Sequence, residues 1–225
     1  MDVNKLTLDK IFDPTVRLEA PLFQGPYVWN RRENWEPLWE AIKHIAEKRV
    51  EKSRVRPHFL GTVVLDQLKT PTGSLYARQI IDGQQRLTTL QIALAAIRDL
   101  CELSGQENFR KAFAKLTDND TPLSDDPNEV FKVWPTNADR ESFASVMRSR
   151  SAKTIRKTSL ESDDEQLIPE AYLYFSDVAS DLLGSADEPD YLTRLRALYE
   201  TLKDQLNLVV IDLDQNDEPR KYFRP

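Results

Sequence analysis

Hydrophobic positions in the first half of the chain alternate between strand-like and helix-like spacing. Residues 59–65 (Phe-Leu-Gly-Thr-Val-Val-Leu) are rich in β-branched types and predict a buried strand. Pro71-Thr72-Gly73 is a turn signal, so we expect a hairpin that returns through residues 75–81. Residues 17–22 predict a shorter extended segment, which a polar, aromatic loop follows.

Two helices are predicted in the same half. The first buries one face, with Asn34 as its candidate N-cap and Pro37 in its first turn. Its apolar face, at helical spacing, consists of Trp35, Leu38, Trp39, Ile42 and Ile45. The second helix begins at Gln84, directly after an Asp-Gly turn. It has apolar residues on several sides, which predicts a central helix.

The second half of the chain has a mostly helical pattern. We expect one helix over about 169–183, with Gly184 as its stop, and another over about 191–206. Thr136 is a candidate cap for a further helix, with Asp139 near the positive end of that helix.

Two segments complete the pattern. Residues 151–166 contain few hydrophobes and many charges, which predicts a mobile loop. Residues 208–213 predict a strand that returns to the first sheet. The expected fold class is α+β. A small mixed sheet with helices would occupy residues 1–105, and a mainly helical portion with a final strand at about 207–213 would occupy residues 106–225.

Composition indicates an ordinary soluble domain. Apolar residues make up 40% and charged residues 30% of the 225 residues. The one cysteine, Cys101, excludes an intramolecular disulfide and suits a reducing cytoplasm. We find no signal peptide and no apolar run of about 20 residues, the length that a membrane span needs. We therefore expect a cytoplasmic protein without a membrane partner.

The charge balance narrows the classes of partner. A net charge of −6 argues against a domain that coats nucleic acid, because such binding needs many clustered cations. Local basic runs exist at residues 31–32 and 48–56, and their simplest interpretation is a solvated face. The two histidines, His44 and His58, have no neighbouring cysteines or carboxylates at zinc-ligand spacing.

Residues 79–90 combine a strand end, a glycine turn and a helix start. The N-terminus of a helix offers unpaired N–H groups and partial positive charge, which suit a phosphate group. Gly83 lets the backbone approach a ligand, and Arg86 can contact phosphate oxygens with two N–H groups. Asp82 could bind Mg²⁺, and Gln84 or Gln85 could orient a water or a base.

A purely structural turn is the alternative for this segment. Asp-Gly is common in turns, and the segment is not a Walker A loop. The residues alone therefore leave both interpretations open.

Residues 82–90 (Asp-Gly-Gln-Gln-Arg-Leu-Thr-Thr-Leu) match without change the hallmark of the GmrSD-type restriction endonuclease family, which the chain resembles. The N-terminal domain of that family is related in fold to ParB and sulfiredoxin. Weaker family signatures occur in the expected order at residues 21–29, residues 59–65, Pro135-Thr136 with Asp139-Arg140, and residues 209–213 followed by Asp217. The resemblance covers nearly the whole chain.

The resemblance implies a ParB/sulfiredoxin-like domain from a bacterial phage-defence protein. It implies a Mg²⁺-dependent nucleoside triphosphatase, with a nucleoside triphosphate and Mg²⁺ as ligands. The catalytic residues would be Asp82, Gln85 and Arg86, with Asp82 also holding the metal. The nucleotide-binding residues would be Gly83, Gln84, Arg86, Gln24 and Tyr27. Sulfiredoxin chemistry is not expected, because it needs a cysteine where Gln84 and Gln85 stand.

The implied partners are modified phage DNA and an HNH-type nuclease domain or subunit outside this chain. The resemblance is compatible with an oligomer, and it leads us to expect no nuclease activity from this chain alone. The alternative is a nucleotide-switched or modified-DNA-binding module with little or no turnover. Gly25 stands where the family usually has arginine, which favours this alternative.

Overall fold

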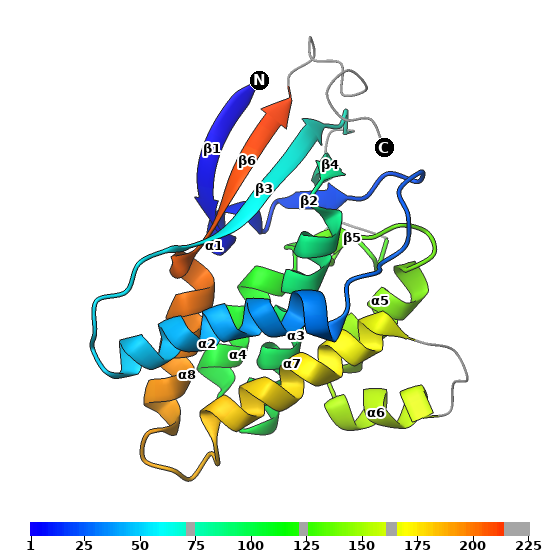
Figure 1. Ribbon diagram of the computed structural model, residues 1–225. Helices are drawn as coiled ribbons and strands as arrows, with labels where there is room; N and C mark the ends of the chain where they lie inside the picture. Colours follow the sequence, from blue (N-terminus) through cyan, green and yellow to red (C-terminus); the bar gives the residue numbers. More distant parts are fainter. Residues whose placement is uncertain (71–74, 122–125, 161–165, 214–225) are drawn as a thin grey trace.

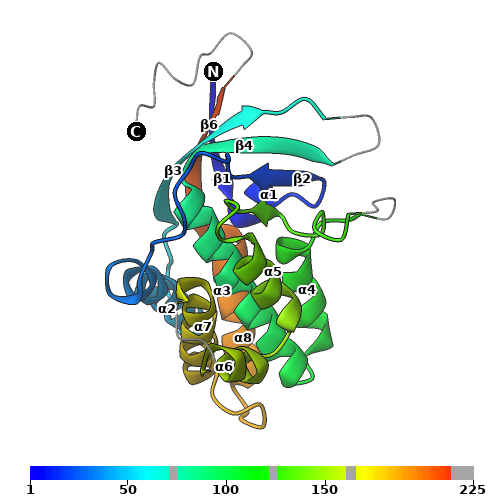
Figure 2. The same cartoon turned by 90° about the vertical axis from the view of Figure 1, so that its right-hand side faces the viewer.

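A six-stranded mixed sheet caps a bundle of helices (Figures 1 and 2). This computed structural model describes residues 1–70, 75–121, 126–160 and 166–213. The strands are β1 (Asp2–Thr7), β2 (Val16–Glu19), β3 (His58–Gln67), β4 (Tyr76–Asp82), β5 (Val133–Trp134) and β6 (Leu206–Leu213). Their order in the sheet is β1-β6-β3-β4-β2-β5. The predicted α+β class is confirmed.

The helices follow the strands in chain order. They are α1 (Leu8–Ile11), α2 (Glu36–Val50), α3 (Gln84–Leu103), α4 (Glu107–Thr117), α5 (Arg140–Ser149), α6 (Ala152–Leu160), α7 (Leu167–Leu183) and α8 (Tyr191–Glu200). Two π-helical turns, η1 (Arg31–Trp35) and η2 (Thr201–Gln205), lie directly before α2 and directly after α8. None of the helices in the described ranges combines the length and apolar character that crossing a bilayer requires.

Strand β6 lies in the sheet between β1, at its edge, and β3. It runs antiparallel to β1 and parallel to β3, so the predicted return of the closing strand is confirmed. Strands β3 and β4 pair antiparallel, as the predicted hairpin requires. The expected turn at residues 71–73 lies outside the described residues. Strand β1 was not predicted, because this edge strand is largely exposed and its apolar alternation is short.

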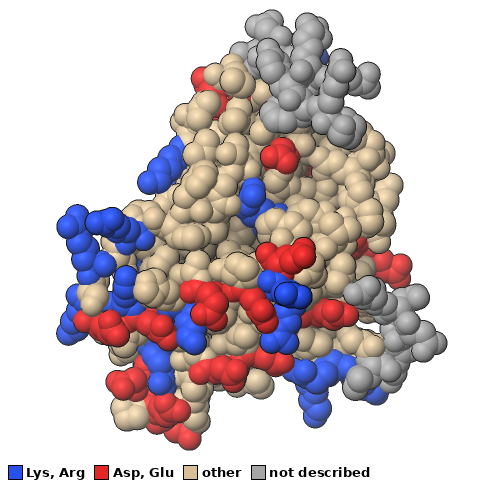
Figure 3. All heavy atoms as spheres, viewed as in Figure 1, with Lys and Arg blue, Asp and Glu red and all other residues tan. Residues whose placement is uncertain are grey.

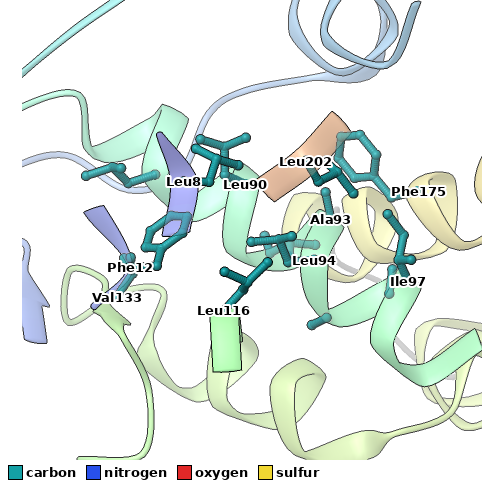
Figure 4. Packing of buried hydrophobic residues seen from close by; sticks show 14 of the residues in the cluster. Leu8, Phe12, Leu90, Ala93, Leu94, Ile97, Leu116, Val133, Phe175 and Leu202 are labelled. Atoms are coloured by element: carbon teal, nitrogen blue, oxygen red, sulfur yellow. The ribbon is translucent and has the colours of Figure 1, made fainter. Parts of the chain in front are cut away.

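Helix α3 is the centre of the hydrophobic core, as predicted. It lies between α7 and α4 in Figure 2, and its apolar residues from Leu87 to Ile97 are almost fully buried. Figure 4 shows Leu90, Ala93, Leu94 and Ile97 of α3 packed against side chains from several other elements. The surrounding residues labelled there are Leu8, Phe12, Leu116, Val133, Phe175 and Leu202. One core therefore fixes the direction of α3 relative to the sheet.

Two predicted helix caps are wrong. The turn before α2 is capped by Asn30, whose side chain accepts the N–H of Glu33 at 3.1 Å. Asn34 lies inside that turn and its side chain accepts the N–H of Asn30 at 3.1 Å. Thr136 is not the cap of α5, since that helix begins at Arg140 with Asp139 at the cap position. For the turn before α2, Asn30 and Asn34 are equally good N-cap residues, so residue type alone did not show which of them is the cap.

The predicted mobile loop at residues 151–166 is wrong over most of its length. Residues 152–160 form α6, and residues 161–165 lie outside the described residues. The helix is held by buried Ile155, and by Arg156, which binds Asp177 of α7 at 2.7 Å. A single apolar anchor is too weak a periodic signal to separate such a helix from a polar loop.

A buried ionic network ties α3 to its neighbours. The Arg98 side chain is fully buried and binds Asp99 at 2.8 Å and Asp118 at 3.0 Å. Arg98 also donates to the Met147 carbonyl of α5 at 3.0 Å, and Tyr172 of α7 donates to Asp99 at 2.7 Å. Burial, followed by the charge of Asp99, raises the pKa of Tyr172, so its hydroxyl remains a donor at neutral pH.

Arg98→Met should lower the free energy of unfolding by about 3–5 kcal/mol, because it leaves Asp99 buried without its cation. The measurement is urea denaturation followed by circular dichroism. Arg156→Met is the matched control, since its exposed pair with Asp177 should contribute less than about 1 kcal/mol. Equal losses in the two variants would contradict a structural role for the buried network.

Candidate functional site

The turn between β4 and α3 contains one residue, Gly83. Its backbone is left-handed, with φ +95°, a conformation that favours glycine. A Cβ at this position would lie 2.8 Å from Cγ2 of Val63 on β3. The turn therefore needs glycine both for its conformation and for its packing.

Helix α3 starts directly after Gly83 with an open N-terminus. No side chain caps it, and its first turn contains no acidic residue. The first N–H groups of a helix have no partner within the helix, and the helix dipole adds partial positive charge there. The end of α3 can thus bind an anion without displacing a carboxylate of its own.

A cavity of about 440 Å³ lies against this helix end. One wall is the segment 82–86 and the other is the loop after β2, so the structure brings together residues about 60 positions apart. The residues around it are Gln24, Gly25, Pro26, Val28, Trp29, Asp82, Gly83, Gln84, Gln85 and Arg86. The volume lies within the range of about 300–1,000 Å³ that is usual for small-molecule sites.

Arg86 is held at the edge of this cavity by β3. Its guanidinium donates to the Thr62 carbonyl at 2.8 Å and lies 5.9 Å from the centre of the Trp29 ring. Burial lowers the pKa of Arg86, and the charge of Asp82 acts in the opposite direction. Gly61 permits this position, because a Cβ there would lie 2.9 Å from the guanidinium carbon. An arginine has five N–H donors, so those not bound to Thr62 can serve a ligand.

Gln85 fastens the two walls together. Its side-chain oxygen accepts the N–H of Val28 at 2.9 Å, and its side-chain nitrogen donates to the Pro26 carbonyl at 2.9 Å. Both ends of the amide are thus bound to the loop backbone. Gln85 is a positioning residue in this geometry, rather than a group that contacts a reacting water.

The expectation that the Tyr27 side chain lines the same cavity is wrong. The residue is only 5% exposed, and its hydroxyl lies 2.6 Å from the Thr89 hydroxyl and accepts from the Trp35 indole at 2.9 Å. Thr89 in turn donates to the Gln85 carbonyl at 2.8 Å. Burial raises the pKa of Tyr27 to about 12. The ring points into the core because α3 offers it a buried hydroxyl partner.

Two glutamines bring buried amide groups to the cavity walls. Gln24 donates to the Ile80 and Ile81 carbonyls of β4, at 3.2 and 3.0 Å. Its side-chain oxygen and the Gln84 side-chain nitrogen are buried and have no hydrogen-bond partner among the described residues. Buried polar atoms without a partner are uncommon in folded proteins, and a bound ligand is one explanation for them.

Asp82 is the carboxylate of the site. It lies at the last position of β4, is exposed, and lines the cavity. Within the described residues, no cluster of three or more histidine, cysteine or acidic side chains could hold a metal alone. Mg²⁺ commonly uses one or two carboxylates together with substrate phosphates, so a single aspartate fits a metal that arrives with a nucleotide.

Asp139 holds the loop of the site from outside the cavity, a contact that its position near a helix end had not indicated. Its carboxylate accepts the backbone N–H of Tyr27 at 2.9 Å and the Thr136 hydroxyl at 2.7 Å. It therefore fixes the loop from the side opposite Gln85. The Pro-Thr-x-x-Asp-Arg signature at residues 135–140 was the sequence signal that could have drawn attention to Asp139. Its spacing alone gives no reason to pair this residue with Tyr27.

Comparison with known proteins identifies the family of this chain. The family model described as "GmrSD restriction endonuclease, N-terminal domain" matches residues 7–224. No curated protein matches the chain. Because the family model covers nearly the whole chain, the chain belongs to the GmrSD restriction endonuclease N-terminal domain family.

Proposed function

We propose that this domain binds a nucleoside triphosphate with Mg²⁺ between segment 82–86 and the loop 24–29, and hydrolyses it. Nucleotide state would control recognition of modified phage DNA, and an HNH-type nuclease domain or subunit elsewhere would cut that DNA. The observation that carries the proposal is the open N-terminus of α3, which faces the same cavity as the Arg86 guanidinium.

Phosphate binding would use two kinds of donor. The first N–H groups of α3 converge on one point and carry partial positive charge, so they suit the non-bridging oxygens of a phosphate. Arg86 adds a full charge beside them, with N–H donors to spare after its bond to the Thr62 carbonyl. Together these donors would stabilise the charge that develops during phosphoryl transfer.

Asp82 would bind the metal. Its exposed carboxylate at the strand end is open to a cation at the cavity mouth. The metal, when bound, would neutralise part of the phosphate charge. Asp82 would orient it by a single ligand, while phosphate oxygens and water complete the coordination.

Gln85, Tyr27 and Asp139 would act by holding the loop, not by touching the nucleotide. Gln85 and Asp139 bind the backbone of residues 26–28, and Tyr27 anchors the same segment in the core. The loop supplies Gln24 and Trp29 to the cavity. Its fixed position would preorganise the site before a ligand enters.

Arg86→Ala should weaken nucleotide binding by about tenfold to a hundredfold, the effect of losing charge-assisted hydrogen bonds of about 1.5–3 kcal/mol. The measurement is equilibrium binding of ATP, GTP, CTP and UTP with Mg²⁺, followed by phosphate release for each nucleotide that binds. Arg32→Ala removes an exposed arginine from η1 and is the matched control. Unchanged nucleotide affinity in a folded Arg86→Ala protein would refute the proposed pocket.

Gly25→Arg should strengthen nucleotide binding by about tenfold, the effect of one added charge-assisted hydrogen bond of about 1.5 kcal/mol. The position accepts a side chain, because nothing lies within 4 Å of a Cβ at residue 25. Gly25→Ala controls for the backbone change. Weaker binding in the arginine variant alone would mean that the cavity rejects further positive charge.

A second candidate function is a modified-DNA sensor with little turnover. The outer part of the loop exposes three apolar side chains: Leu22 is 70%, Phe23 83% and Val28 60% exposed. Exposed aromatic and aliphatic residues beside a cavity are suited to stacking on a base.

Phe23→Ala should then reduce the preference for modified over plain duplex, because base stacking on an aromatic ring contributes about 1–3 kcal/mol. The measurement is the ratio of dissociation constants for the two duplexes. Phe59→Ala is the control, since Phe59 is also exposed but lies on β3 and not in the loop after β2. An unchanged ratio would count against the sensor.

A further inference from the structure

A second, cationic cavity lies at the C-terminal end of α2. It has a volume of about 610 Å³ and is bounded by the last turns of that helix and by the segment that leads into β3. Its residues are Ala41, His44, Ile45, Lys48, Arg54, Val55, Arg56, Pro57 and His58. No carboxylate lines it, although acidic residues outnumber basic ones in the chain by 37 to 31.

The carboxylates of helix α2 lie away from the cationic cavity, although Lys43 of the same helix lies among them. The acidic residues of α2 and of the position after it line a different cavity, of about 860 Å³, between α2 and α7. They are Glu36, Glu40, Glu47 and Glu51. Figure 3 shows the acidic side chains in rows across the middle of this face, and a group of lysines and arginines at its left edge. None of these carboxylates lines the cationic cavity.

The cations of this cavity differ from the neighbouring Arg49 in having no ion-pair partner among the described residues. Arg49 binds Glu200 at 2.8 Å and Asp204 at 2.7 Å, and so belongs to the packing of α2 on α8. Lys48, Arg54 and Arg56 form no ion pair with any residue in the described ranges. A solvated face of a structural helix usually alternates its charges, whereas this surface keeps three like charges together.

We propose that this cationic cavity binds the phosphodiester backbone of duplex DNA, at a site separate from the nucleotide cavity. The cations come from two elements and are spread around an open surface, which suits several successive phosphates better than one small anion. His44 and His58 add ring N–H donors at its border. Contacts of this kind position a protein on DNA and carry no sequence information.

Strand β3 links the two sites. Its first residue, His58, lines the cationic cavity, and Thr62 holds Arg86 at the nucleotide cavity. Four residues of strand span about 13 Å. DNA bound at the cationic cavity would thus lie near the loop 24–29 without occupying the nucleotide site.

The test is fluorescence anisotropy of a labelled, unmodified duplex with the full chain at 50 to 200 mM salt, without nucleotide. Three phosphate contacts predict a slope of log affinity against log salt of about −2.7, which is roughly a 40-fold loss across this range. Lys48→Gln, Arg54→Gln and Arg56→Gln combined should bring the slope close to zero and weaken binding at 50 mM salt by at least about tenfold.

The control removes the same charge elsewhere. Lys111→Gln, Lys115→Gln and Lys153→Gln combined change three exposed lysines of α4 and α6 and should leave the slope as in the unmodified chain. Equal losses in the two triple variants, or a duplex that does not bind, would overturn the proposal. Arg86→Ala should keep the slope, so failure of the nucleotide site and failure of this surface are distinguishable.

Discussion

The left-handed turn at Gly83 is the constraint on which the site depends. It joins the sheet to the central helix through one residue, and Val63 leaves no room for a side chain there. Because the core surrounds α3 and the Arg98 network binds it to its neighbours, the start of the helix cannot shift. The open N–H groups of α3 are consequently fixed relative to β3 and β4. Preorganisation of this kind comes from the fold itself and not from any single ligand contact.

Elements with strong periodic patterns were predictable from the sequence, and weakly patterned ones were not. Helix α3 is buried along most of its length, and strand β3 has a run of buried β-branched and aliphatic residues at Val63, Val64 and Leu65, so both give a strong signal. Among residues 152–159 of helix α6 only Ile155 is buried, and strand β1 lies exposed at the sheet edge. In both cases tertiary packing selects the conformation, so the local sequence predicts it poorly.

The candidate site was predictable in its location but not in the division of roles. The motif at residues 82–90 and the resemblance directed attention to one turn and to Gln24, which the structure brings to one cavity. Gln85 and Tyr27 acquire their roles from partners 57 to 112 residues away, namely Val28, Pro26 and Asp139. Sequence spacing does not predict contacts between residues so far apart in the chain. Residue type suggested reactive groups, whereas geometry assigns two of these side chains to holding the loop.

The two walls of the proposed nucleotide cavity depend on the core to different degrees. The inner wall joins the core through Gly83 and α3, and a side chain at position 83 would meet Val63, so this turn cannot change without cost to folding. The outer wall is held mainly through its backbone and through the buried Tyr27, while residues 22, 23, 25 and 28 face outward. Because these positions are exposed, substitutions there are expected to change the surface of the outer wall at little cost to the stability of the domain.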